Sequence, residues 1–531
     1  MPPLASLLLL PSLLAAACGG GHDALTTAPT PPGGGVPAVR PVLAPTYRAS
    51  GHAAAGDVFV HLFEWKWTDV ARECEGVLGP AGFKAVQVSP PEEHSVQSDH
   101  TWSERYQPVS YSIERSRSGT GDEFRAMVQR CRAAGVDVYV DAVINHMTNA
   151  PSPGVGSNGT AYTKYEYPGL YTATDFHTPC TVTNYQDAAN VQDCELLGLP
   201  DLNTGSASVR QKIAGYLIGL ARAGVAGFRI DAAKHIQPVE LDSIVGLVNR
   251  TLASEGRALP YYFGEVIDYG GEAVKKTDYF GLGYASGGAA DVTEFKFRYT
   301  ANKFLGANGE HVSQLNPAGP AGSQFSESAW GIMPADKAVV FLENHDTQRS
   351  DGIWYRDGQT YRLANVWMLA QPYGYPSVMS SYAFDRTPAG IVAGPPSDAN
   401  GNTTPVSCAA SLDAAAVGQW VCEHRDPYIR SMIAFRRVVA GAPVTRWWDD
   451  GANAIAFSRG DRGFVAINRN GAALDATVAT GLPAGTYCDR LTGGRAGAGC
   501  AGARLTVDAA GTVRLTVGAN AAVAVDATTR L

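Results

Sequence analysis

Short runs of apolar and β-branched residues recur along the chain from residue 57 onward, and many of them end in polar residues. Stretches with helical periodicity, such as 123–134 and 209–223, lie between several of these runs. Strands that alternate with helices indicate an α/β fold with a parallel sheet. Seven or eight such units fit a closed TIM (β/α)8 barrel better than an open sheet. The predicted strands are 58–65, 85–89, 136–146, 225–231, 261–265, 339–346 and 376–381.

Two segments depart from this alternation. The stretch that begins at residue 147 is rich in Gly, Thr, Tyr and Asn and is too long for an ordinary loop after the third strand, which indicates an inserted domain. After about residue 440 short strands with turn signals follow, as in a small antiparallel β domain. We therefore predict a catalytic barrel over 56–146 and 201–440, an inserted domain over 147–200 and a C-terminal β-sandwich domain over 441–531.

The N-terminus has the pattern of an exported protein. Residues 4–17 are mostly apolar and end in Ala15-Ala16-Ala17, which is typical of a secretory signal peptide with an A-x-A cleavage site. Residues 14–18 also resemble a bacterial lipoprotein signal, in which Cys18 would be acylated, and both interpretations stay open. Residues 19–55 are rich in Gly, Pro and Thr and are predicted to form a linker. We expect a secreted protein, or one anchored to the cell envelope through Cys18.

Composition narrows the choice of function. Apolar residues make up 45% of the 531 residues and charged residues 17%, which is typical of a folded chain. The net charge is −8 and no basic run is present, which argues against nucleic acid as a partner. The N-terminal apolar run is too short to span a bilayer.

Nine cysteines are present, and the eight besides Cys18 form an even set, which in an exported chain suggests four disulfides. No Cys-x-x-Cys occurs, which argues against a zinc cluster. Many pairings are possible. Spacing makes three local pairs plausible and leaves a fourth, namely Cys180–Cys194, Cys408–Cys422, Cys488–Cys500 and Cys74–Cys131.

Three carboxylates end predicted strands, namely Asp231, Glu265 and Asp346. On a barrel these side chains converge on one face. Arg229, two residues before Asp231, projects the same way and would keep that carboxylate ionised, as a nucleophile requires. Glu265 follows an aromatic run, a partly buried setting that suits a general acid. An acid and a nucleophile on either side of one bond are the groups that glycoside hydrolysis needs, although a carboxylate at a strand end is often only a helix cap or a surface charge.

The chain resembles the α-amylase family of glycoside hydrolases (family 13), and in particular its animal-type members. The resemblance covers about residues 57–531 and rests on an ordered set of motifs, with the lipoprotein-like signal suggesting a secreted bacterial member. The motifs are HLFEWKW (61–67), VQVSPP (86–91), ERYQPVSY (104–111), DAVINH (141–146), LPDLNT (199–204), GFRIDAAKH (227–235), GEVI (264–267), FLENHD (341–346) and WVCEHR (420–425).

The resemblance implies endo-hydrolysis of α-1,4-glucosidic bonds in starch, glycogen and maltooligosaccharides by a monomer. Asp231 matches the nucleophile, Glu265 the acid/base and Asp346 the transition-state stabiliser. Matching disulfide spacings support the four pairs given above. The family's aromatic platform is a Trp-Trp pair, whereas here Trp102 is followed by Ser103; the polar neighbours of Trp102 predict that it is exposed. The implied substrate-binding residues are Trp102, Tyr106, Gln107, His146, Arg229, Lys234, His235 and His345.

The resemblance also implies a structural calcium ion. Its ligands would be the side chains of Asn145 and Asp201 and the main-chain carbonyls of Gln192 and His235, an oxygen set that suits Ca²⁺. Animal-type members also bind an activating chloride through two arginines and an asparagine. Arg229 and Asn344 match two of these positions, but Ser377 stands at the third, and we therefore predict no functional chloride dependence.

Two alternatives remain. One is a related family 13 enzyme with another linkage or product preference, or with transglycosylation as its main reaction. The other is a barrel that binds glucans without catalysis; such relatives lack one or more catalytic carboxylates, whereas all three are present here.

Overall fold

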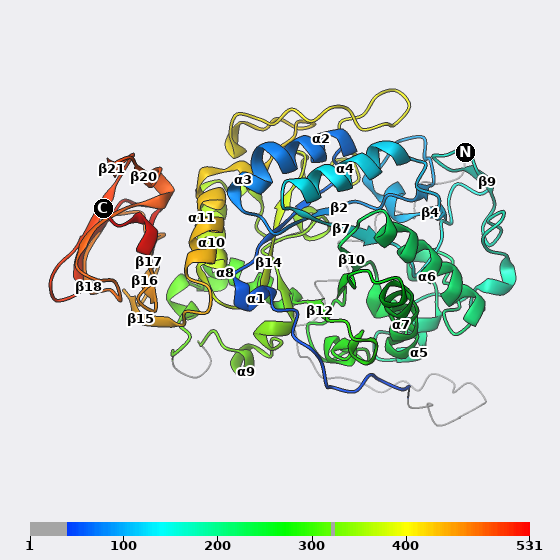
Figure 1. Cartoon of the computed structure of the whole chain (residues 1–531), viewed down its shortest axis with the longest axis horizontal. Coiled ribbons are helices and arrows are strands. Elements are labelled where there is room, and N and C mark those ends of the chain that lie inside the picture. Colours follow the sequence, from blue (N-terminus) through cyan, green and yellow to red (C-terminus); the bar gives the residue numbers. More distant parts are fainter. Residues whose placement is uncertain (1–39, 320–323) are drawn as a thin grey trace, which may run out of the picture.

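The computed structural model describes residues 40–319 and 324–531. Its centre is a closed barrel of eight parallel strands (Figure 1), which confirms the predicted α/β barrel. In their order around the barrel the strands are β1 (Phe59–Leu62), β2 (Ala85–Val88), β7 (Asp137–Ala142), β10 (Gly227–Ile230), β11 (Tyr261–Gly264), β12 (Ala290–Thr293), β13 (Ala338–Val340) and β14 (Tyr375–Ser380).

Seven of these strands match predicted runs, whereas β12 was not predicted. It has four residues, and Asp291 interrupts its apolar character. The Asp291 carboxylate is buried and accepts hydrogen bonds from Tyr261 and Ser50, both at 2.7 Å. Polar partners inside the fold therefore allow a strand that a hydrophobicity pattern misses.

Helices cover the outside of the barrel, and the helical periodicity at 123–134 and 209–223 corresponds to α4 and α6. Helix α4 begins with a capping box between Thr120 and Glu123, which fixes its start locally. The longer barrel helices are α2 (Trp67–Glu73), α4 (Gly121–Ala133), α6 (Ala207–Arg222), α7 (Pro238–Ser254), α10 (Gln359–Ala370) and α11 (Pro427–Val438). In the described ranges, no helix combines the length and the apolar character needed to cross a bilayer.

Residues 40–55, which composition assigned to the linker, lie against the barrel. The short helix α1 (His52–Ala55) places the His52 ring 4.3 Å from the Tyr375 ring, in a stacked arrangement at the amino end of the strands. Arg48 donates to the carbonyl of Gly288 at 2.9 Å, and Arg40 pairs with Asp193. The signal peptide, Cys18 and residues 19–39 lie outside the described residues.

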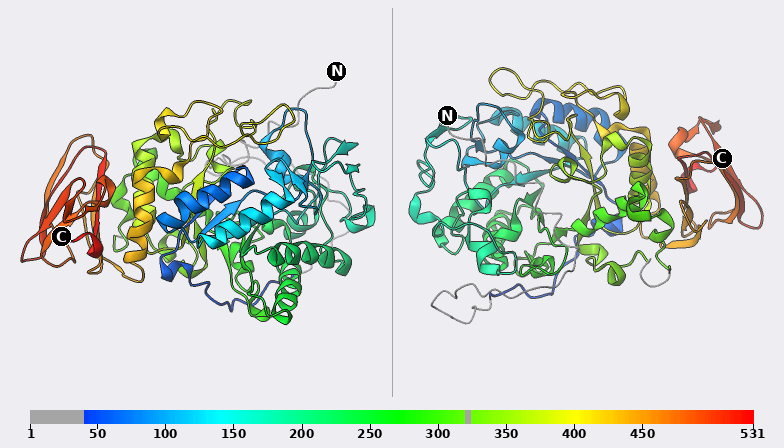
Figure 2. Two further views of the ribbon diagram at one scale, coloured as in Figure 1. Left: turned by 45° about the horizontal axis from the view of Figure 1, so that its top comes forward. Right: turned by 180° about the vertical axis from the view of Figure 1, so that it is seen from behind.

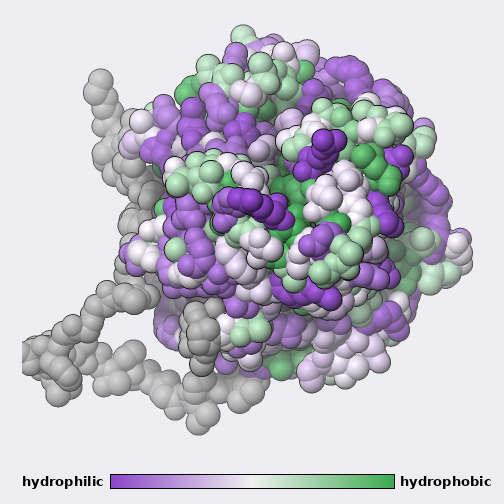
Figure 3. Space-filling model, turned by 90° about the vertical axis from the view of Figure 1, so that its left-hand side faces the viewer, coloured by the Kyte–Doolittle hydropathy of each residue, from purple (hydrophilic) through white to green (hydrophobic). Residues whose placement is uncertain are grey.

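The segment after β7 forms small pieces of structure, namely β8 (Gly154–Val155), β9 (Ala161–Tyr162) and α5 (Ala188–Asp193). At the other end of the molecule the C-terminal β domain follows α11 (Figure 2), and its outer face carries hydrophilic and hydrophobic residues side by side (Figure 3). Its strands include a four-stranded antiparallel sheet of β15 (Val444–Asp449), β16 (Ala454–Arg459), β17 (Gly463–Asn468) and β24 (Ala521–Asp526), and the pairs β18 (Leu474–Ala479) with β23 (Thr512–Val517) and β19 (Gly485–Cys488) with β22 (Arg504–Val507).

All four predicted disulfides are present. Cys74–Cys131 joins the end of α2 to α4, Cys180–Cys194 closes a loop in the inserted segment, and Cys488–Cys500 lies in the C-terminal domain. Cys408–Cys422 closes a loop before α11. Each region of the chain therefore carries its own covalent cross-link.

Candidate active site

One guanidinium group holds three carboxylates at the carboxyl ends of neighbouring strands. Arg229 lies on β10, and its Nη1 is 2.8 Å from Oδ1 of Asp231 and 2.5 Å from Oδ1 of Asp141. Its Nη2 is 2.5 Å from Oε1 of Glu265, at the end of β11. The parallel register pairs Arg229 with Asp141 on β7, which explains why these two side chains meet. The arrangement confirms that Arg229 and Asp231 project the same way.

The cluster is almost closed to solvent. Asp231 is 7% exposed and Glu265 is 8% exposed. Burial raises the pKa of Asp231 well above its usual range, and Arg229 opposes this rise. Arg229 favours the ionised form of Asp231 and burial opposes it, because one guanidinium group serves three buried carboxylates.

Glu265 has a second fixed contact. Its Oε2 accepts a hydrogen bond from the main-chain N–H of Ala232 at 2.9 Å. Ala232 adopts a left-handed conformation (φ 48°), which turns its N–H toward β11. The two carboxyl groups of Asp231 and Glu265 are thus held by the same short segment after β10, with the guanidinium between them.

Asp346 approaches from β13. Its side chain is 36% exposed, and Oδ2 lies 3.4 Å from Nε2 of His345. The turn is fixed by Asn344, whose Oδ1 accepts from the N–H groups of Asp346 at 3.1 Å and Thr347 at 2.8 Å. This carboxylate is therefore positioned by the backbone and remains accessible to a ligand.

Aromatic rings form one side of the site. The Tyr106 and His345 rings stack at 5.0 Å with an angle of 6° between their planes. Trp102 meets both rings edge-on at 5.8 and 5.6 Å, and the Tyr106 hydroxyl donates to Asp141 at 3.0 Å. Trp102 is partly buried and donates to the carbonyl of Ile391 at 3.0 Å, so it is less exposed than its polar neighbours suggested. Ring Nε2 of His146 lies 2.9 Å from the Tyr106 carbonyl oxygen.

The remaining predicted substrate residues lie where the barrel meets the inserted segment. The Lys234 ammonium donates to the carbonyl of Ile267 at 2.6 Å and pairs with Glu272. The His235 ring lies 2.8 Å from the carbonyl of Val191, and Gln107 accepts from the Thr148 hydroxyl at 3.0 Å. These contacts tie Gln107, Lys234 and His235 to neighbouring loops.

Two acidic residues were missed by the sequence analysis. Asp141 is fully buried against Arg229 and Tyr106, and Glu272 pairs with Lys234. Asp141 lies in the middle of the third predicted strand (136–146) but near the end of β7, opposite Arg229 on β10, so its place at the site follows from the strand register. Glu272 lies in a loop, where periodicity carries no information.

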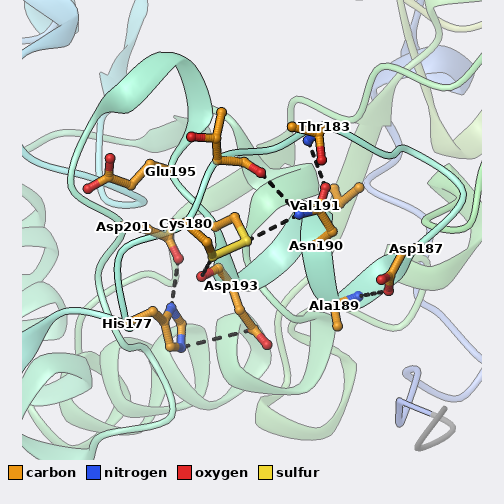
Figure 4. The surroundings of a disulfide bond; sticks show 12 residues. His177, Cys180, Thr183, Asp187, Ala189, Asn190, Val191, Asp193, Glu195 and Asp201 are labelled. Atoms are coloured by element: carbon orange, nitrogen blue, oxygen red, sulfur yellow. Dashed lines mark hydrogen bonds and ion pairs between the residues drawn. A yellow bond between two sulfur atoms is a disulfide. The ribbon is translucent and has the colours of Figure 1, made fainter. Parts of the chain in front are cut away.

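The four predicted calcium ligands come from segments that meet at this junction. Asp201 pairs with His146 in an antiparallel bridge, and the N–H of Leu202 donates to the Asn145 carbonyl at 3.0 Å. The His235 ring contacts the carbonyl of Val191, so the adjacent residue Gln192 also lies at this junction. Figure 4 shows His177 between Asp201 and Asp193, beside the Cys180–Cys194 disulfide, with its Nδ1 2.6 Å from Oδ2 of Asp201.

The donor set at this junction fits a hard cation. Asp201 is 3% exposed, and within the described residues its Oδ1 has no hydrogen-bond partner. Burial raises the pKa of Asp201 to about 7, so a neighbouring cation would stabilise its charged form. In the described ranges no group of three or more His, Cys, Asp and Glu side chains is placed to hold a metal, so the candidate ligands include an amide and main-chain oxygens.

The chain is similar to known proteins over most of its length. The family model described as "Alpha amylase, catalytic domain" matches residues 81–378, and the one described as "Alpha amylase, C-terminal all-beta domain" matches residues 447–528. Pancreatic alpha-amylase 2a5 of Mus musculus is 44% identical over 483 residues, covering 86% of this chain and 91% of that protein. Alpha-amylase of Tenebrio molitor is 43% identical over 474 residues, covering 88% and 95%.

A solved structure is similar over most of its length. It is a mutant of alpha-amylase I from Eisenia fetida in complex with maltohexaose, with a TM-score of 0.80 and 37% sequence identity. The match covers 91% of this chain and 98% of that chain.

Proposed function

Because this chain belongs to the α-amylase family, with its animal-type members among its relatives, we infer that it is an endo-acting α-amylase that hydrolyses internal α-1,4-glucosidic bonds of starch, glycogen and maltooligosaccharides. The main observation in support of this function is that the Arg229 guanidinium contacts both Asp231 and Glu265. These contacts hold the two carboxylates beside one guanidinium at the carboxyl end of the barrel, which is where TIM-barrel enzymes have their active sites.

In the proposed mechanism Asp231 is the nucleophile. Its carboxylate attacks the anomeric carbon while Glu265 gives its proton to the glycosidic oxygen, and the bond to the leaving sugar breaks. Glu265, now ionised, takes a proton from a water molecule, which hydrolyses the glycosyl ester and restores both groups. Two inversions give net retention. Asp346 stabilises the positive charge that develops on the sugar ring, since it is both accessible and held by Asn344.

The neighbouring residues would bind the sugars. Trp102, Tyr106, His146 and His345 lie together on one side, and we assign them to the glucose residues near the bond that breaks and on its donor side. Lys234 contacts the loop after Glu265, and the neighbouring His235 contacts the inserted segment; we assign both to the acceptor side. Gln107 is next to Tyr106 and completes this lining.

We assign a structural calcium ion to Asn145, Asp201 and the carbonyls of Gln192 and His235. When bound, the ion would supply positive charge to the junction between barrel and inserted segment. The ion would join the loop that carries Lys234 and His235 to the inserted segment, in addition to the contact between His235 and Val191. Its removal by EDTA is therefore expected to loosen this loop and to reduce activity.

Chloride is not expected to activate the enzyme, because Ser377 on β14 stands where animal-type members have a second arginine. The measurement is starch hydrolysis in chloride-free buffer against increasing sodium chloride, with sodium nitrate at equal ionic strength as the control. A rate that is flat within about twofold is expected. Strong activation by chloride alone would contradict the prediction.

The localisation proposal rests on the N-terminal pattern and the four disulfides, which suit an exported enzyme. We propose secretion by a bacterial host, with attachment to the cell envelope if Cys18 is acylated, and action as a monomer. Mass spectrometry of the mature N-terminus distinguishes an unmodified Cys18 from an acylated Cys18.

The function is tested by the release of reducing ends from soluble starch by the wild type and by Asp231→Asn. The wild type is expected to abolish iodine staining well before most sugar is released, as internal cleavage requires. Asp231→Asn should lose activity by about four orders of magnitude or more, as is typical when a nucleophile is removed. Asp122→Asn, at an exposed carboxylate on the outer helix α4, is the control. Activity that survives Asp231→Asn, or activity on another linkage only, would favour the alternatives.

A further inference from the structure

Two tyrosines, the half-buried Tyr269 and the exposed Tyr299, form an aromatic pair in loops near the carboxylates. Tyr269 follows Glu265 by four residues, and Tyr299 ends the short helix η9 (Phe295–Tyr299) after β12. Their ring centroids lie 5.5 Å apart, with 38° between the planes. Tyr299 is 43% exposed, and Ile267, in the same loop as Tyr269, is 38% exposed. Both loops leave the carboxyl ends of their strands, which is the face that carries Asp231 and Glu265.

The pair is held by a buried arginine. Arg298 is 8% exposed; its Nη1 donates to the Tyr269 hydroxyl at 3.2 Å, and its Nη2 donates to Asp351 at 2.9 Å. Asp351 lies five residues after Asp346, so this one side chain connects the loops that follow β11, β12 and β13. Phe295 packs edge-on against Tyr269 at 6.3 Å. A platform supported in this way loses little conformational freedom when a ligand stacks on it.

The platform continues the proposed sugar-binding surface. The carbonyl of Ile267 accepts the hydrogen bond of Lys234, and Glu272 pairs with the same ammonium. The loop therefore runs from Glu265 along Lys234, on the proposed acceptor side, and carries Tyr269 between these two contacts. Tyrosine rings offer an apolar face and a hydroxyl, which matches the C–H face and the hydroxyl rim of a glucose ring.

We propose that Tyr269 and Tyr299 form a further glucose-binding subsite, which takes the reducing-end part of a long α-1,4-glucan beyond the sugar at Lys234. This inference rests on the proposed function. It makes the enzyme favour substrates that extend past Lys234, and it affects short substrates little.

The test compares the wild type with Tyr269→Ala and Tyr299→Ala on two substrates, namely maltoheptaose and a nitrophenyl maltotrioside whose leaving group is too short to reach the pair. For the variants, KM for maltoheptaose should rise about three- to tenfold, the range expected for one lost stacking contact. Cleavage of end-labelled maltoheptaose should shift toward bonds that leave fewer sugars on the acceptor side. Kinetics on the nitrophenyl substrate should not change.

The controls separate the possible outcomes. Tyr284→Ala removes an equally exposed tyrosine (41%) that lies before β12, at the opposite end of the strands, and should change nothing. Tyr299→Phe should keep the wild-type KM. A wild type without activity on either substrate would contradict the proposed function itself. If the wild type is active and both variants keep its KM and its cleavage pattern, the proposed subsite is overturned. Equal losses of activity on both substrates would also overturn it, because they would show that the tyrosines only support the loops.

Discussion

At the scale of single residues, Arg229 decides how the active site is charged. It is 4% exposed and contacts Asp141, Asp231 and Glu265, so the cluster carries more negative than positive charge. A planar guanidinium with several donors can hold three carboxylates at once, whereas an ammonium cannot. The position therefore tolerates no other cation without a change in the protonation of the nucleophile.

We predict that Arg229→Lys lowers kcat by about 100-fold or more, since lost hydrogen bonds in a buried cluster cost several kcal/mol. The pKa of Asp231 is raised by burial and lowered by Arg229. Weaker contacts in the variant should raise this pKa further, so the acid limb of the kcat/KM profile should move to higher pH. The control is Arg222→Lys, an exposed arginine paired with Glu255. An acid limb that stays in place would show that Arg229 does not set the charge of the nucleophile.

The residue scale also shows what a sequence can predict. Asp231, Glu265 and Asp346 were found because each ends a predicted strand; Asp231 and Glu265 directly follow β10 and β11, whereas Asp346 lies six residues after β13. Asp141 was missed because its contacts depend on strand register, and Glu272 because it lies on a loop that the fold brings to Lys234. A hydrophobicity pattern along the chain predicts where a strand ends, but it does not predict which residues of other strands or loops lie beside that end.

At the scale of elements, the Cys180–Cys194 disulfide secures the segment that carries the proposed calcium ligands. It closes a loop with a sequence separation of 14 and precedes Asp201 by seven residues. The main-chain N–H of Glu195 donates to the carbonyl of Cys180 at 2.8 Å, so the two ends of the loop are also paired through the backbone. The disulfide limits the unfolded conformations of this loop.

We predict that replacing both Cys180 and Cys194 by alanine lowers the stability of this segment by about 3 kcal/mol, as chain entropy gives for a loop of this length. Inactivation by EDTA should become at least severalfold faster, because the ligand loop opens more often. The matched control removes Cys488 and Cys500, whose separation is 12 but which lie in the C-terminal domain. Equal EDTA sensitivity in the two variants would argue that the disulfide does not support the calcium site.

Residues 40–55 and strand β12 show that the average composition of a segment does not always predict its structure. Residues 40–55 contain Pro, Gly and Ala and were assigned to a linker, yet His52 stacks on Tyr375 and Ser50 bonds Asp291. Strand β12 was missed for a related reason, since the same Asp291 makes it look polar. In both cases a few specific contacts outweigh the average character of the segment. Where patterns are long and periodic, as in α4 and α6, prediction and structure agree.

At the scale of the whole molecule, buried carboxyl groups outside the active site set how stability depends on pH. Glu423 is fully buried and accepts hydrogen bonds from the Ser381 N–H at 2.8 Å and hydroxyl at 2.9 Å. Burial raises the pKa of Glu423 to about 7, and burial likewise raises the pKa of Glu92 to about 7. In the unfolded chain both groups ionise near their ordinary value, about 4.3.

The direction in which stability changes with pH follows from the number of protons bound in the folded and in the unfolded state. Between about pH 4.5 and 7 the folded protein holds protons on Glu92 and Glu423 that the unfolded chain releases, so its stability falls as pH rises through this window and levels off above it. Each group contributes on the order of 2–4 kcal/mol to this loss. Glu423→Gln keeps an acceptor for Ser381 and cannot ionise, so the fall in Tm between pH 5 and pH 8 should become smaller. Glu75→Gln, at an exposed carboxylate paired with Arg130, should leave the fall unchanged. If Glu423→Gln keeps the full wild-type fall, Glu423 does not contribute to it, and the pH dependence must come from other buried carboxyl groups such as Glu92 and Asp201.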